Sequence, residues 1–111
     1  PNYDAKNIAH CLEQLRAHKL PTGIMVDCSH SNSGKRHEQQ EVVFNNVLEQ
    51  RVQGTHDIIG MMVESNIFPG AQKLPADRSQ LKYGVSLTDE CIGWETTDRL
   101  LRQAHSLLAP K

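Results

Sequence analysis

The sequence lacks several features that would place it in a large functional class. None of its apolar runs approaches the roughly 18 residues needed to span a bilayer, and its first residues, PNYD, have neither the basic nor the apolar region of a signal peptide. Its 12 Lys and Arg residues balance 13 Asp and Glu residues, and aromatic residues make up only 5%. There is thus neither a basic surface nor a stacking platform for nucleic acid. We expect no nucleic-acid or membrane partner.

Cysteine is also scarce, and its spacing argues against a disulfide framework. The three cysteines, Cys11, Cys28 and Cys91, include no C-x-x-C pair. An odd, sparse count suits a reducing cytoplasm, and it predicts small buried apolar side chains. The length fits one segment, residues 1–111, with a modest core. Because an initiator Met is missing, we expect the chain to start inside a longer protein or to have been cut.

Hydrophobic periodicity predicts helices that alternate with short buried strands. The expected elements are helix 5–18 with Asp4 as its N-cap, strand 23–28, helix 38–52, strand 56–66, a long loop 67–82, strand 83–89 and a last helix capped by residues 96–98. The buried stripe of the last helix is expected to comprise Leu100, Leu101, Ala104, Leu107 and Leu108. The connections are long enough for parallel strands, which predicts the α/β class. A doubly wound sheet and an arc of a (β/α) barrel both fit this order.

Polar side chains follow each predicted strand, where the chemistry of parallel α/β enzymes lies. The three strand ends carry His30, Glu64 and Asp89. If the strands are adjacent, one imidazole and two carboxylates meet, a set suited to Mn²⁺, Fe²⁺, Co²⁺ or Zn²⁺. The alternative is that these residues are solvated loop side chains or helix caps, and spacing alone leaves both open.

Two further patterns near His30 carry less information. Ser29 precedes His30, but no G-x-S-x-G elbow and no evident orienting acid indicate a hydrolase. Residues 31–35, SNSGK, lie before a helix and could hold a phosphate or form an ordinary loop. The remaining histidines are expected to be structural or on the surface; they are His10, His18, His37, His56 and His105.

Four long segments resemble the class I 3-deoxy-D-arabino-heptulosonate 7-phosphate (DAHP) synthases. They are PNYDAKNIAHCLEQLRAHKLP, IMVDCSHSNSGK, IIGMMVESNIFPGAQKL and YGVSLTDECIGWETTDRLLRQ, and together they cover nearly the whole chain in order. The resemblance implies the C-terminal portion, about three strands and their helices, of a (β/α)8 TIM barrel. It also implies a homo-oligomeric cytoplasmic enzyme that condenses phosphoenolpyruvate with erythrose 4-phosphate, the entry to aromatic amino acids.

The same resemblance assigns roles to individual residues. The family holds a divalent metal with Cys, His, Glu and Asp, and the last three match His30, Glu64 and Asp89. It implies that His30 also contacts substrate, that Lys35 is a substrate contact, and that Asp27 orients the ligating imidazole.

The departures from the family limit what the chain does alone. The metal-binding Cys and most phosphate-clamping Arg and Lys residues lie upstream of this sequence, and Cys28 and Cys91 do not replace that Cys. We therefore expect the isolated chain to be inactive and to need the missing N-terminal part of the barrel. The alternatives are a non-catalytic assembly or binding module and a metal-dependent aldolase of another specificity.

Overall fold

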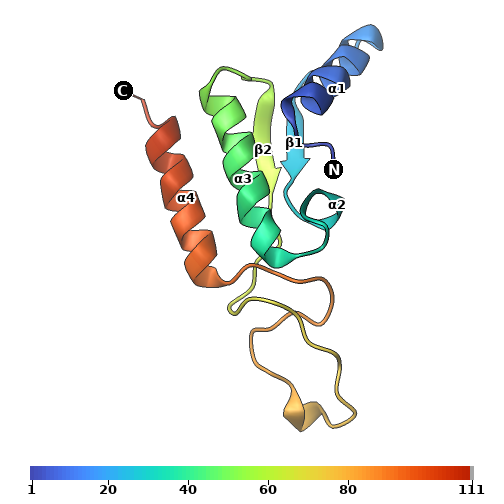
Figure 1. Ribbon diagram of the computed structural model, residues 1–111, viewed down its shortest axis with the longest axis vertical. Coiled ribbons are helices and arrows are strands. Elements are labelled where there is room, and N and C mark those ends of the chain that lie inside the picture. Colours follow the sequence, from blue (N-terminus) through green and yellow to red (C-terminus); the bar gives the residue numbers. More distant parts are fainter. Residues whose placement is uncertain (111) are drawn as a thin grey trace.

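The computed structural model describes residues 1–110, in which helices cover one face of a short parallel sheet (Figure 1). The helices are α1 (Ala5–Ala17), α2 (His30–Ser33), α3 (His37–Val52) and α4 (Trp94–Leu108), the 3-10 turn is η1 (Arg78–Gln80), and the strands are β1 (Ile24–Asp27) and β2 (Ile58–Met62). The strands pair in parallel, from Ile24 opposite Ile58 to Asp27 opposite Met62. The predicted α/β class with parallel strands is therefore confirmed.

Helix boundaries follow local signals that the sequence carries. The side chain of Asp4 accepts a hydrogen bond from the backbone N–H of Asn7, so Asp4 is the N-cap of α1 as predicted. Gly34 ends α2 in the left-handed conformation, with φ of 61°. The short helix α2 was not predicted, because four residues are too few to show helical periodicity.

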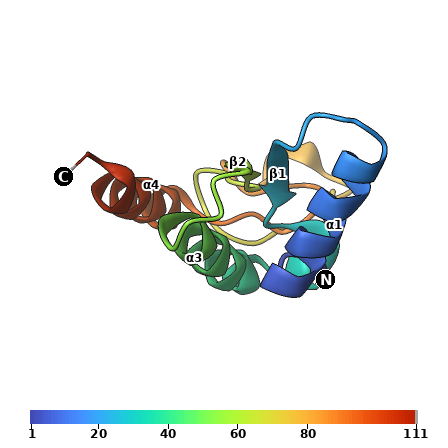
Figure 2. The same ribbon diagram turned by 90° about the horizontal axis from the view of Figure 1, so that it is seen from above.

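The molecule is a thin slab of one helical layer on one sheet. Figure 2 shows α1, α3 and α4 along one side of the two strands, and the overall extents are 53 × 35 × 19 Å. Successive strand residues point to opposite faces: Val26 and Ile58 are buried under the helices, whereas Met25 and Ile59 are 66% and 72% exposed. One face of the sheet is thus apolar and uncovered.

The core lies between the strands and the helices. Its buried members are Ile8, Leu12, Val26, Cys28, Val43, Phe44, Val47, Leu48, Ile58, Ile92 and Leu100. Helix α3 supplies the largest share of this cluster and is therefore the central support of the sheet.

The third predicted strand, 83–89, is wrong. Within residues 1–110 this segment forms a turn, with Gly84 at a φ of 72°, and an isolated bridge between Ser86 and Ala71. The parallel pairing expected beside β2 occurs farther along, as a single bridge between Ser65 and Ile92. The segment does not join the sheet, because its backbone carbonyl groups accept hydrogen bonds from the loop 67–72 instead of from a neighbouring strand.

Two predictions of burial are also corrected. Leu100 of the α4 stripe is buried, but Leu101, Leu107 and Leu108 are exposed, because α4 packs against α3 along one side only. Cys28 is buried as predicted, whereas Cys11 is exposed and Cys91 is only partly buried. None of the helices in residues 1–110 has the length and apolar character needed to cross a membrane.

Candidate metal centre

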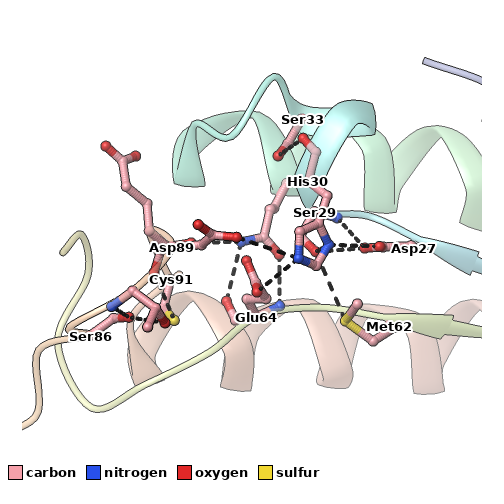
Figure 3. Close-up of polar contacts among 12 residues, drawn as sticks. Asp27, Ser29, His30, Ser33, Met62, Glu64, Ser86, Asp89 and Cys91 are labelled. Atoms are coloured by element: carbon pink, nitrogen blue, oxygen red, sulfur yellow. Dashed lines mark hydrogen bonds and ion pairs between the residues drawn. The ribbon is translucent and has the colours of Figure 1, made fainter.

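The three residues predicted from the strand ends lie together in the structure. The Nε2 atom of His30 is 3.4 Å from Oε1 of Glu64 and 3.4 Å from Oδ2 of Asp89. Potential ligand atoms of the three side chains all lie within 4.8 Å of one another. Figure 3 shows the two carboxylates converging on the imidazole.

Different local structures bring these side chains to one edge of the sheet. His30 follows β1 and opens α2, and Glu64 follows β2, so the parallel pairing places both at the carboxyl ends of the strands. Asp89 comes from the long segment before α4, which extends beyond those ends (Figure 1). His30 adopts a φ of 51°, a left-handed conformation that costs a non-glycine residue about 1–3 kcal/mol and is concentrated at functional sites.

Asp27 and Ser29 orient the imidazole. Oδ2 of Asp27 lies 2.8 Å from Nδ1 of His30, while Oδ1 of Asp27 accepts hydrogen bonds from the Ser29 hydroxyl at 2.6 Å and the Ser29 N–H at 2.8 Å. A proton on Nδ1 that is donated to Asp27 leaves the Nε2 lone pair facing Glu64 and Asp89. This arrangement is the one in which a carboxylate prepares a histidine to bind a metal.

The same contacts exclude a serine hydrolase. The Ser29 hydroxyl lies 2.9 Å from Nδ1 of His30, the nitrogen that also meets Asp27. A catalytic triad requires the serine at one ring nitrogen and the acid at the other, and Ser29 is only 1% exposed. The spacing of residues around Ser29 shows no evident orienting acid, because an i, i+3 contact across a turn has no signature in strand periodicity. Only the family resemblance pointed to Asp27, as a partner of His30.

The electrostatics of the centre follow from these contacts. The hydrogen bond to Asp27, together with the negative charge of Glu64, raises the pKa of His30 above its ordinary value of 6.5. Burial acts to raise the pKa of Asp27, but the hydrogen bonds from Ser29 and His30 outweigh it and lower that pKa. Burial and the charge of Asp27 raise the pKa of the Cys28 thiol to about 12, so Cys28 does not offer a thiolate ligand.

We expect Asp27→Asn to lower the pKa of His30. The substitution removes the largest cause of the upward shift, while the weaker attraction of Glu64 and Asp89 remains. A raised pKa means that protonated His30 stabilises the fold at low pH, a contribution lost as pH rises through the folded-state pKa. NMR titration of the His30 ring measures the change, and Asp77→Asn, at a remote exposed aspartate, is the control. An unchanged His30 midpoint in Asp27→Asn would contradict the assignment of Asp27.

A second group of polar side chains lies at the N-terminus of α3, around His37. Oε2 of Glu90 accepts hydrogen bonds from the backbone N–H of His37 at 2.9 Å and lies 2.7 Å from its Nδ1. Glu38 lies near the other ring nitrogen at 3.6 Å. The helix N-terminus that could have held a phosphate therefore faces the chain's own Glu90 carboxylate. Lys35 is exposed, and within residues 1–110 its side chain makes no hydrogen bond or ion pair.

The donor set of the His30 centre fits a divalent cation. One imidazole nitrogen and two carboxylates are suited to Mn²⁺, Fe²⁺, Co²⁺ or Zn²⁺. The side chains of His30 and Asp89 are nearly half exposed, so the centre is accessible from solvent. An open pocket of about 410 Å³ lies beside His30 but does not include Glu64 or Asp89; it is lined by Pro1, Asn2, Asp27, Ser29, His30, Ser31 and Asn32.

Comparison with known proteins identifies the family. Residues 1–102 match the family described as "DAHP synthetase I family". The chain belongs to this family. The Tyr-sensitive phospho-2-dehydro-3-deoxyheptonate aldolase of Salmonella typhimurium is 46% identical over 109 residues, which cover 98% of the chain and 31% of the relative. The Phe-sensitive enzyme of Escherichia coli is 48% identical over 103 residues, covering 93% and 29%.

A solved structure has the same arrangement of elements as this chain. It is the phospho-2-dehydro-3-deoxyheptonate aldolase of Francisella tularensis, which superposes with a TM-score of 0.90 at 34% identity, over 97% of this chain and 31% of that one. The chain therefore spans about a third of the length of each of these three proteins.

Proposed function

We propose that this chain is the C-terminal part of a DAHP synthase and of its (β/α)8 barrel. The complete enzyme joins phosphoenolpyruvate to erythrose 4-phosphate and releases DAHP and phosphate, the first step of the shikimate pathway. The observation that carries the proposal is the convergence of His30, Glu64 and Asp89 at the carboxyl ends of the strands in a chain of this family. We assign these residues as ligands of a divalent metal ion.

Each residue of the centre has a defined task in this proposal. Asp27 holds the His30 ring so that Nε2 faces the two carboxylates. Glu64 and Asp89 each supply a negative charge. The two carboxylates repel each other unless a cation lies between them. A bound divalent ion supplies Lewis acidity toward an aldehyde oxygen. The exposed Lys35 remains available to substrate hydroxyl and phosphate groups.

The bond changes of the reaction balance with water as the one further reactant, whose hydroxyl adds to phosphoenolpyruvate while the former aldehyde oxygen gains a proton. A bond forms between C3 of phosphoenolpyruvate and the aldehyde carbon of erythrose 4-phosphate. Water adds at C2 of phosphoenolpyruvate, and the C–O bond to phosphate breaks. His30 lies both at the proposed metal and at the open pocket, so it is the residue we assign to substrate contact as well as ligation.

The proposal requires residues beyond this chain, because the chain spans only 31% of the Salmonella relative. We propose that a fourth, cysteine ligand and most phosphate-binding cations come from the remaining part of the barrel. The uncovered sheet face with Met25 and Ile59 is the surface that this part would cover. We further propose a cytoplasmic homo-oligomer, which suits the free thiols of Cys11, Cys28 and Cys91.

A chimera tests the function directly. This chain replaces the matched 109 residues of the Salmonella typhimurium relative, and product formation from phosphoenolpyruvate and erythrose 4-phosphate is measured. We expect turnover that is lost on chelation of divalent metal, and no turnover from the 111-residue chain alone. A folded chimera without activity, beside an active parent, would refute the catalytic assignment. Product from the isolated chain would refute its dependence on the rest of the barrel.

The exposed apolar sheet face favours one alternative, a non-catalytic assembly module. Exposed strands and apolar surface promote association, and Met25 and Ile59 lie on the uncovered face. Light scattering on the isolated chain distinguishes the cases. Dimers or larger species that persist in an inactive chimera support the module, and a well-folded monomer counts against it.

A further inference from the structure

Gln40 is a buried polar side chain that the proposed metal site does not use directly. It lies on α3 and is 1% exposed. Its Oε1 atom accepts a hydrogen bond from the backbone N–H of Glu64 at 2.9 Å, and its Nε2 atom donates to the backbone C=O of Glu64 at 3.2 Å and of Glu90 at 3.4 Å. Because two of these three partners are carbonyl oxygens, the orientation of the amide is determined.

The contacts of Gln40 join the two segments that carry the carboxylates of the metal centre. Gln40 hydrogen-bonds both the backbone N–H and the backbone C=O of Glu64. It also hydrogen-bonds the backbone C=O of Glu90, the residue that follows Asp89 in the sequence. The same Glu64 carbonyl also accepts a hydrogen bond from the N–H of Ile92 at 2.9 Å. In effect, the Gln40 side chain extends the hydrogen-bond pattern of the sheet at the point where regular strand pairing has ended.

Helix α3 contacts this region at a second point one turn away. The backbone N–H of His37 donates to the Glu90 carboxylate, and His37 and Gln40 are three residues apart on one helix face. Helix α3 also contributes Val43, Phe44 and Val47 to the core. Gln40 is therefore attached to the most firmly packed element of the fold, as a positioning group must be.

We propose that Gln40 is a positioning residue that holds the Glu64 and Asp89 segments at the separation a divalent metal requires. This inference rests on the proposed function and adds a residue that touches neither metal nor substrate. Loss of a supporting partner behind metal ligands typically weakens metal affinity by about 10–100-fold. We therefore expect Gln40→Leu to weaken Co²⁺ binding by about tenfold.

The test uses Co²⁺ as the probe in the chimera with the Salmonella relative. The variants are Gln40→Leu, which removes all three hydrogen bonds, and Gln40→Glu, which retains the acceptor but loses the amide donor. We measure Co²⁺ affinity and the visible absorption spectrum of the bound ion, which reports ligand geometry. Both variants should weaken binding and alter the spectrum, and Gln40→Glu should do so even if Gln40→Leu fails to fold.

Two controls separate positioning from general destabilisation. Gln39→Leu makes the same change at the adjacent, partly exposed position, whose side chain forms no hydrogen bond within residues 1–110. Val47→Ala removes volume from the buried core of α3 without touching Glu64. Both control variants should leave the spectrum of bound Co²⁺ unchanged and should change the Co²⁺ affinity by no more than about twofold. Removal of a group that supports metal ligands lowers the affinity by about tenfold or more.

The outcomes distinguish this inference from the proposed function. If the unmodified chimera binds Co²⁺ and the Gln40 variants match the controls in affinity and spectrum, the positioning role is overturned while the metal site stands. If the unmodified chimera fails to bind Co²⁺ although the Salmonella parent binds it, both proposals are overturned.

Discussion

His30→Asn in the chimera is expected to lower Co²⁺ affinity and turnover by more than about a hundredfold, the upper end of the loss caused by removing an outer-shell partner. His30 is the nitrogen donor of the proposed centre, and its Nε2 lies 3.4 Å from both carboxylates. Asparagine is the informative replacement because it tolerates the left-handed φ of 51° at this position better than most residues. Backbone strain is therefore not added to the loss of the ring.

The measurements are Co²⁺ titration by absorption and product formation at saturating substrate. His105→Asn, at an exposed position near the end of α4, is the matched control and should retain both properties. Binding and turnover that survive in His30→Asn would remove His30 from the metal centre, and the strand-end interpretation would then fail with it.

Phe44→Ala is expected to destabilise the fold by about 3–5 kcal/mol, the usual cost of truncating a buried aromatic side chain. Phe44 lies in the core on α3, between the sheet and the neighbouring helices. Native proteins have total stabilities of about 5–15 kcal/mol, so the variant chimera should lose much of its resistance to unfolding.

Urea denaturation of the chimera with the Salmonella relative, followed by circular dichroism, measures this effect. Val42→Ala is the control, because Val42 lies on the same helix but is 51% exposed. It should change the stability by no more than about 0.5 kcal/mol, as for other surface positions. Equal losses in the two variants would show that the α3 core is not the main support of the fold.

The predicted elements agreed with the structure where a pattern was local and repeated. The helical spacing of apolar residues on α1 extends over more than ten residues, and Asp4 caps α1 as its type and position suggested. The segment 83–89 misled the same method. Its composition suits a strand, but Gly84 turns the chain and the backbone pairs with a distant loop.

The candidate site divides in a similar way. His30, Glu64 and Asp89 were found because each lies at or just beyond the end of a predicted strand, although 83–89 is not a strand in the structure, and because the family resemblance names the same three. Gln40 was missed because a polar residue in a helix is expected on the surface. Nothing in the sequence shows that its amide contacts residues 24 and 50 positions away. The contact between Glu90 and His37 was missed for the same reason, at a separation of 53 residues.

The sequence by itself determined the α/β order, the parallel strands and the polar residues at the strand ends. These features depend on the pattern of apolar and polar residues within a short stretch of chain, which the sequence shows directly. Only the tertiary structure decided that Asp89 reaches the centre from an irregular segment and that Gln40 joins the two carboxylate-bearing segments. The Gln40 contacts depend on how α3 packs against the sheet, and packing is a property of the whole buried cluster rather than of any stretch of sequence.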